Sequence, residues 1–146
     1  MSRLLLLLAA CSLEAVTTGQ VEAVISVESS GNPKAIGRLG ERGLCQFFPA
    51  AWEDATRWRK AHGLPTYGYS TWSLDADVGR EYATSWLTLL EERLTARLGR
   101  KPTIGELYAA HQLGFAGFAS KGFDIRRCPK LTRLVASRLE RDPRTK

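Results

Sequence analysis

Hydrophobic residues recur along this chain at the spacing of an α-helix, whereas the alternation typical of β-strands is scarce. The clearest example precedes the turn formers of residues 29–33. Its members stand at positions i, i+3, i+4 and i+7, namely Val21, Val24, Ile25 and Glu28. This spacing places them on one face of a helix. We therefore predict a mainly α-helical domain.

Two further helices follow from start and stop signals. One begins at Pro49, where the missing N–H costs nothing, and stops before Gly63. A long central helix is capped by Ser73 or Asp75 and closes at Gly99. Between these two helices, residues 64–72 are predicted to form an aromatic loop.

The C-terminal part of the chain predicts two more helices. Thr103 and Glu106 have the spacing of a capping box, in which each side chain accepts a hydrogen bond from the backbone N–H of the other residue. That helix is expected to end at Gly114. Gly117 and Gly122 interrupt the next stretch, and a last helix is expected from after Pro129 to about residue 141.

Length and composition limit the chain to one ordinary folded domain. It has 146 residues, 44% of them hydrophobic and 25% charged, and a net charge of +6. The cations are concentrated near the C-terminus: Arg126, Arg127, Lys130, Arg133, Arg138, Arg141, Arg144 and Lys146. We interpret them as a solvated helix face that favours anionic surroundings, and we expect no nucleic-acid partner.

The N-terminus carries the basic start and short apolar run of an export signal. The alternative is an apolar first helix of the domain. The run ends in Leu8-Ala9-Ala10-Cys11, which resembles a lipobox, so Cys11 is a candidate lipid anchor. We divide the chain into a leader at residues 1–11 and a single domain at 12–146. Cys45 and Cys128 remain as a candidate pair in an oxidising compartment.

Glu28 breaks the local pattern, because it is an acid on an apolar stripe. It also stands at a helix C-terminus, where the macrodipole disfavours negative charge. Desolvation and the dipole both penalise the ionised form, which favours a carboxyl that keeps its proton. Glu28 is therefore a candidate general acid. The alternative is an exposed carboxylate at the edge of the stripe, or one paired with Arg42.

Three motifs, taken in order, resemble those of the soluble lytic transglycosylase (SLT) family. Residues 24–33, Val-Ile-Ser-Val-Glu-Ser-Ser-Gly-Asn-Pro, resemble the first. Residues 43–49, Gly-Leu-Cys-Gln-Phe-Phe-Pro, resemble the second, with Cys45 in place of the usual Met. Residues 105–114 resemble the third, with His111 and Gln112 where Tyr and Asn are commoner.

The resemblance implies a lysozyme-like fold with a cleft between two lobes. It also implies a lytic transglycosylase that cleaves the MurNAc-β-1,4-GlcNAc bond of peptidoglycan and leaves a 1,6-anhydromuramyl end. Glu28 would be the catalytic acid and then the base. The candidate substrate-binding residues are Ser29, Gln46, Tyr108, His111 and Gln112.

Ordinary glycoside hydrolysis needs a second carboxylate. The nearest acids in the motif region are Glu41, in a glycine-rich loop, and Glu53 and Asp54, on a polar helix face. We interpret all three as surface charges, which favours the single-carboxylate lyase reaction. Two alternatives remain open: a goose-type-like lysozyme that hydrolyses the same bond, and a non-catalytic glycan-binding or virion structural protein.

Other features complete the expectations. Tyr67, Tyr69 and Trp72 suit either a saccharide groove or core packing. No metal-ligand spacing is visible, and the expected reaction needs no cofactor. We expect a monomer that acts on peptidoglycan strands. Its location would be the periplasm or cell envelope, with or without a lipid anchor, or a phage-associated lysin.

Overall fold

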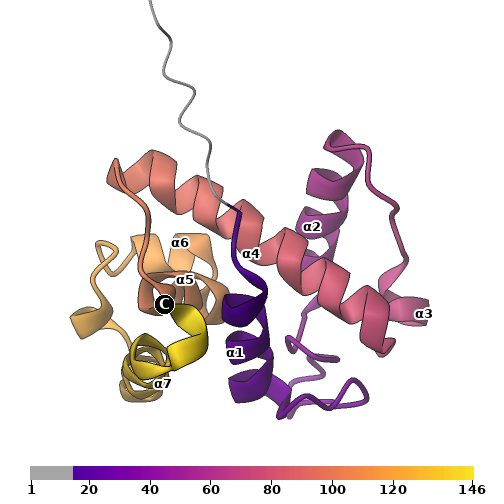
Figure 1. Cartoon of the computed structure of the whole chain (residues 1–146), viewed down its shortest axis with the longest axis horizontal. Coiled ribbons are helices and arrows are strands. Elements are labelled where there is room, and N and C mark those ends of the chain that lie inside the picture. The colour runs from indigo at the N-terminus through magenta and orange to yellow at the C-terminus, as the bar shows by residue number, and fades with distance from the viewer. Residues whose placement is uncertain (1–14) are drawn as a thin grey trace, which may run out of the picture.

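The computed structural model describes residues 15–146, and that part of the chain is mainly helical (Figure 1). Its helices are α1 (Thr18–Ser29), α2 (Pro49–Ala61), α3 (Tyr69–Trp72), α4 (Ala76–Leu98), α5 (Ile104–Leu113), α6 (Phe115–Ala119) and α7 (Lys130–Arg141). Two 3₁₀ turns follow α6 and α7, η1 (Ile125–Arg127) and η2 (Pro143–Thr145). The predicted fold class is confirmed. The predicted leader and Cys11 lie outside the described residues.

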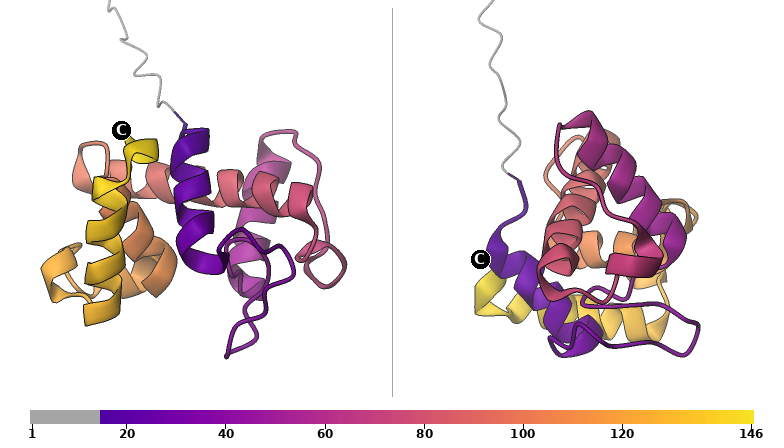
Figure 2. Two further views of the ribbon diagram at one scale, coloured as in Figure 1. Left: turned by 60° about the horizontal axis from the view of Figure 1, so that its bottom comes forward. Right: turned by 90° about the vertical axis from the view of Figure 1, so that its right-hand side faces the viewer.

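The long helix α4 joins two groups of helices. Figure 1 shows α2 and α3 beside one end of α4, and α5, α6 and α7 towards the other end, with α1 between the groups. The buried side chains of α4 face both groups, and Tyr82, Leu87, Leu90 and Leu94 are fully enclosed. The segment between α1 and α2 projects beyond the end of α1 in both views of Figure 2. No described helix is long and apolar enough to cross a membrane.

Local capping chemistry explains the helix ends. Asp75 caps α4 by accepting hydrogen bonds from the backbone N–H groups of Asp77 and Val78. Helix α4 stops at Gly99, whose φ of 71° is the left-handed conformation that ends helices. The predicted capping box of Thr103 and Glu106 is present at the start of α5. These boundaries agree with the sequence predictions.

Two predictions about the connecting segments need correction. The aromatic stretch 64–72 is not all loop, because its last four residues form α3. Gly117 does not interrupt the chain either, since it lies within α6. There the neighbouring Phe118 is fully buried and packs edge-to-face against Phe123. This tertiary burial outweighs the low helix propensity of glycine.

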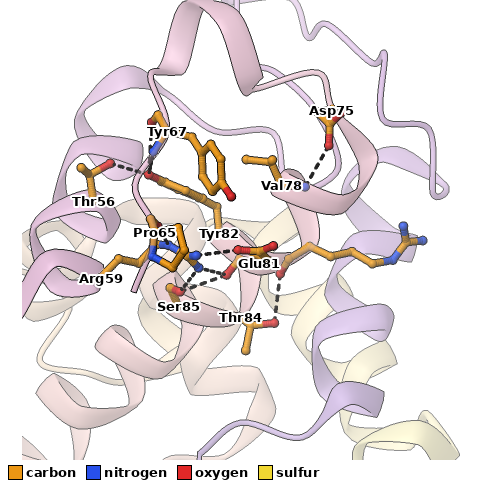
Figure 3. Close-up of polar contacts among 11 residues, drawn as sticks. Thr56, Arg59, Pro65, Tyr67, Asp75, Val78, Glu81, Tyr82, Thr84 and Ser85 are labelled. Carbon is orange, nitrogen blue, oxygen red and sulfur yellow. Dashed lines mark hydrogen bonds and ion pairs between the residues drawn. The ribbon is translucent and has the colours of Figure 1, made fainter. Parts of the chain in front are cut away.

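The side chain of Arg59 links the loop after α2 to helix α4 through hydrogen bonds and an ion pair (Figure 3). It is almost fully buried, and Nε donates to the carbonyl oxygen of Pro65 at 2.7 Å. One terminal nitrogen donates to Ser85 Oγ at 2.9 Å, and the other forms an ion pair with Glu81 at 2.5 Å. Nearby, the Tyr82 hydroxyl accepts from the backbone N–H of Tyr67 at 2.8 Å. One buried guanidinium therefore links α2, the loop that follows it, and α4.

Replacing Arg59 with Met is expected to lower the free energy of unfolding by about 2–4 kcal/mol, because buried acceptors lose their donor. Urea denaturation of both proteins measures the change. Arg57→Met is the matched control, since Arg57 lies on the same helix with 64% of its side chain exposed. That control should change stability by less than about 0.5 kcal/mol. Equal effects of the two substitutions would contradict the role given to Arg59.

Glu106 makes the stability of the domain sensitive to acid. Hydrogen bonds from Arg100, at 2.7 and 2.9 Å, hold the pKa of this carboxyl below its ordinary value of 4.5. The pKa of Glu106 is lower in the folded protein than in the unfolded chain. The ion pair therefore stabilises the fold fully at a pH above the pKa of the unfolded chain, and this stabilisation is lost as the pH falls through the pKa of the folded protein. The wild type should therefore exceed Glu106→Gln in Tm at neutral pH, with the difference shrinking below about pH 4.5. A difference in Tm that does not change with pH would refute this assignment.

Candidate active site

Glu28 lies in the last turn of α1, and its side chain is only 11% exposed. It lines a small cavity of about 80 Å³. The cavity walls are Glu28, Glu41, Gln46, Phe48, His111 and Gln112, which come from α1, the segment before α2, and α5. The structure thus brings together four of the six residues predicted for the site.

A larger groove of about 640 Å³ lies next to the cavity, and Phe48, His111 and Gln112 line both. The groove continues between α2, α4 and the start of α6. Its walls are largely apolar, with Trp86, Leu113 and Phe115 among them, and it carries the charged side chains of Asp54 and Arg93. Such a shape suits an extended ligand whose reacting part lies at Glu28.

His111 approaches the Glu28 carboxylate from α5. Its Nε2 atom lies 3.5 Å from Oε1 of Glu28, and the His111 side chain is 7% exposed. Glu28 Oε1 is buried and accepts no hydrogen bond within residues 15–146. The other ring nitrogen, Nδ1, accepts a hydrogen bond from the indole N–H of Trp86 at 3.0 Å. A buried acceptor without a partner is rare and often marks a functional group.

Tyr108 makes a hydrogen bond to Gln112, one of the residues that line the cavity. Its hydroxyl donates to Oε1 of Gln112 at 3.0 Å, and its ring is buried. Burial, and then the negative charge of nearby Glu28, raise the pKa of the Tyr108 phenol well above its ordinary value. Tyr108 therefore stays neutral near the carboxylate. It is not among the residues that line the cavity or the groove.

Ser29 is the other predicted residue that does not line the cavity. Its hydroxyl donates to the carbonyl oxygen of Ile25 within α1 at 3.2 Å. This is the common back-bonding of a serine inside a helix, so the hydroxyl is used locally. With that bond in place, the Ser29 hydroxyl can meet a ligand only as a hydrogen-bond acceptor.

Gln46 has an unusual backbone. Its φ of 49° lies in the left-handed region, which is uncommon for residues other than glycine. The side chain compensates, because Nε2 donates to the carbonyl oxygens of Gly43 at 2.9 Å and Ala35 at 3.3 Å. Both amide protons are thereby used within the loop. Gln46 is left with its side-chain carbonyl oxygen as the group that can meet a ligand.

The two candidate cysteines are free and buried. Cys45 lies near Glu28, and burial, followed by the charge of Glu28, raises the pKa of its thiol. It is a neutral apolar group beneath the site, as the Cys-for-Met exchange suggested. Cys128 has other neighbours, and its thiol donates to the carbonyl oxygen of Asp124. Among the described residues, no group of three His, Cys, Asp or Glu side chains has the arrangement of a metal site.

Two acidic side chains are not the plain surface charges expected from the sequence. Glu41 is half-buried and lines the cavity, with its Oε2 accepting from the backbone N–H of Leu39 at 2.9 Å. Asp54 lines the groove and pairs with Arg57 and, at 3.7 Å, with Arg93. Glu53 is exposed and paired with Arg57, as expected.

The aromatic residues of segment 64–72 serve packing. The ring of Tyr69 packs against Trp52, and the ring of Tyr67 packs against Tyr82 and Trp72. The indole N–H of Trp52 donates a hydrogen bond to the carbonyl oxygen of Tyr67. The Phe and Trp side chains that line the groove are instead Phe48, Trp86 and Phe115. For Phe48 a signal existed, since it belongs to the second motif, residues 43–49.

Comparison with known proteins supports the motif-based interpretation. None of the curated proteins compared with the chain matches it. The family model of the transglycosylase SLT domain matches residues 8–66, a range that contains the first two motifs, Glu28 and Gln46. The SLT domain match suggests lytic transglycosylase-type activity on peptidoglycan. The resemblance is therefore confirmed: the chain carries a transglycosylase SLT domain match over residues 8–66, within a mainly helical, lysozyme-like fold.

Proposed function

We propose that this protein cleaves the MurNAc-β-1,4-GlcNAc bond of peptidoglycan as a lytic transglycosylase, with Glu28 as its catalytic carboxyl. The observation that carries the proposal is the position of Glu28. It is a nearly buried acid in a cavity that shares Phe48, His111 and Gln112 with an adjoining larger groove. Such a position lets one end of the carboxyl meet a bound glycan while water is largely excluded.

In the proposed reaction, Glu28 first donates its proton to the glycosidic oxygen, so that the bond from C1 of the muramyl sugar to that oxygen breaks. The C6 hydroxyl of the same sugar then attacks C1, and Glu28, now a carboxylate, accepts the hydroxyl proton. The enzyme returns to its starting state, and the product carries a 1,6-anhydro ring. No water and no second carboxylate take part.

Neighbouring residues fit supporting roles. The 2-acetamido group of the substrate can stabilise positive charge at C1, as in substrate-assisted glycosidases. Its N–H matches the one acceptor that Gln46 has left, the side-chain carbonyl oxygen. Gln112 lines both cavity and groove and is tied to Tyr108. We assign both glutamines to substrate binding.

Hydrolysis by a goose-type-like lysozyme is the second candidate, and the position of Glu41 favours it. Glu41 shares the cavity with Glu28 and is the acid best placed to activate water. Its Oε2 is already engaged by the backbone N–H of Leu39, which also fits a purely structural carboxylate that braces the loop. The lyase proposal gives Glu41 that structural role.

Product analysis distinguishes the two reactions. Purified peptidoglycan is digested, and the fragments are examined by mass spectrometry before and after borohydride reduction. Anhydromuramyl ends are lighter by one water and do not react with borohydride. Reducing ends gain two hydrogens. A digest dominated by reducible ends would replace the lyase proposal with hydrolysis.

Glu41→Gln sharpens the comparison. If Glu41 only braces the loop, the amide oxygen keeps the bond to Leu39, and we expect activity to fall less than about 3-fold, well below the 10²–10⁴-fold usual for an acid–base group. If Glu41 activates water, activity should fall by at least about 10²-fold. Initial rates of turbidity loss on purified peptidoglycan measure the difference.

The proposed substrate also suggests a location. Peptidoglycan lies outside the cytoplasmic membrane, so we propose action in the cell envelope, by a bacterial enzyme or a phage lysin. The net charge of +6 suits a matrix of anionic wall polymers.

A further inference from the structure

We infer that Trp86 is a positioning residue that holds His111 in one tautomer, with the ring proton on Nε2 and directed at Glu28. The tautomer follows from contacts in the structure alone. Its catalytic consequence rests on the proposed function. Trp86 belongs to α4 and His111 to α5, so the contact joins the central helix to the helix of the third motif.

The hydrogen bond between Trp86 and His111 can run in only one direction. The indole N–H of Trp86 lies 3.0 Å from Nδ1 of His111. An indole nitrogen can only donate, so Nδ1 must be the acceptor and carries no proton. A neutral imidazole has one N–H, and that proton therefore sits on Nε2. Both side chains are nearly buried, with 5% of Trp86 and 7% of the His111 side chain exposed, so water does not compete for the bond.

The Nε2 atom of His111 faces the carboxyl group of Glu28. Nε2 lies 3.5 Å from Glu28 Oε1, which is buried and accepts no hydrogen bond among the described residues. The Tyr108 hydroxyl is also close to Glu28, but it donates to Gln112. The Nε2 proton is thus a donor available to this oxygen without breaking another bond, whereas the Tyr108 hydroxyl would have to leave Gln112 to donate to Glu28. A small movement of either side chain would shorten the contact to a hydrogen bond, as often happens when substrate binds.

The Nε2–H tautomer of His111 suits both the acid and the carboxylate form of Glu28. After Glu28 has given its proton to the leaving oxygen, Nε2–H stabilises the new carboxylate. In the other tautomer, a lone pair on Nε2 would face Oε1. It would repel the carboxylate, and it would attract the proton of the acid away from the substrate. Trp86 prevents this by occupying Nδ1.

The second histidine provides an internal reference. Nδ1 of His62 lies 2.8 Å from the carbonyl oxygen of Trp58, an acceptor, so His62 must carry its proton on Nδ1. The chain contains only these two histidines. The structure therefore assigns opposite tautomers to them.

Long-range ¹H–¹⁵N correlation spectra of ¹⁵N-labelled protein test the inference, at a pH where both rings are neutral. We expect the Nε2–H pattern for His111 and the Nδ1–H pattern for His62, with His62→Asn used for assignment. An Nδ1–H pattern for His111 in the wild type would overturn the inference without any variant. This measurement needs no substrate, so it stands whether or not the protein releases anhydromuramyl products.

Trp86→Phe tests the role of Trp86 itself. The ring packing is largely kept and the donor is lost, so we expect mixed His111 tautomers and a fall in kcat of about 10-fold or more, with KM little changed. Trp52→Phe is the matched control. It removes another buried indole donor, which binds the Tyr67 carbonyl oxygen, and it should leave the His111 signals unchanged. A Trp86→Phe protein with the wild-type tautomer and wild-type kcat would refute the positioning role.

Discussion

Glu28→Gln is expected to lower the rate of glycan cleavage by at least about 10³-fold, the upper part of the range that a general acid–base group contributes. Gln has nearly the same shape and can still accept a hydrogen bond, but it has no transferable proton. Both proposed steps, donation to the glycosidic oxygen and acceptance from the C6 hydroxyl, would fail together. Anhydromuramyl products released from purified peptidoglycan measure the loss.

The fold should survive this substitution. Oε1 of Glu28 is a buried atom that no donor satisfies among residues 15–146, so replacing the carboxyl with an amide breaks no hydrogen bond at this atom and should not lower Tm. Glu22→Gln is the matched control, because Glu22 lies on the same helix and pairs with Arg80 at 2.8 Å near the surface. It should keep wild-type activity. A wild type no better than Glu28→Gln at cleaving peptidoglycan would refute the enzyme proposal and favour a non-catalytic glycan-binding or virion structural protein.

Helix ends were predictable because their causes are local. Thr103 and Glu106 satisfy each other's backbone N–H groups, and Asp75 does the same for the start of α4, within three residues in each case. Gly99 ends α4 by a backbone conformation that favours glycine. The helix at Gly117 was not predictable in this way, because burial of Phe118 against Phe123 is a tertiary contact.

The candidate site was predictable only in part. Glu28, Gln46, His111 and Gln112 were found through an unusual acid on an apolar stripe and through three short motifs, and all four line one cavity. The motifs did not show which atoms of these residues would be free. Gln46, for example, donates both amide protons to carbonyl oxygens of its own loop.

The other residues that line the groove come together only when helices that are far apart in the sequence pack against each other. Trp86 occupies an apolar position of α4, and its sequence position resembles that of any buried core residue. Its contact with His111, 25 residues away, arises only when α4 packs on α5. Arg93 and Asp54 likewise meet across α4 and α2. No local pattern encodes such pairs.

Among glycine-to-alanine substitutions near the site, Gly43→Ala is expected to cause the largest fall in the free energy of unfolding, about 3 kcal/mol or more. Gly43 opens the second motif with a φ of 76°, a conformation that costs a residue with a side chain about 1–2 kcal/mol. A Cβ atom there would also lie 2.1 Å from the backbone oxygen of Ser73, so one of the two segments must shift. Backbone cannot rotate away as a side-chain end can. Urea denaturation measures the loss.

Gly40→Ala separates the two causes. Gly40 has a similar φ of 88°, but nothing lies within 4 Å of the position its Cβ would occupy. It should therefore show only the conformational cost, about 1–2 kcal/mol. The shift forced at Gly43 should also reach the site, because the carbonyl oxygen of Gly43 accepts a hydrogen bond from Gln46. Gly43→Ala should then raise KM for peptidoglycan under conditions where it is still folded, whereas Gly40→Ala should not. Equal stability losses in the two variants would mean that the Ser73 backbone yields easily and that the close approach of these segments does not constrain the cavity.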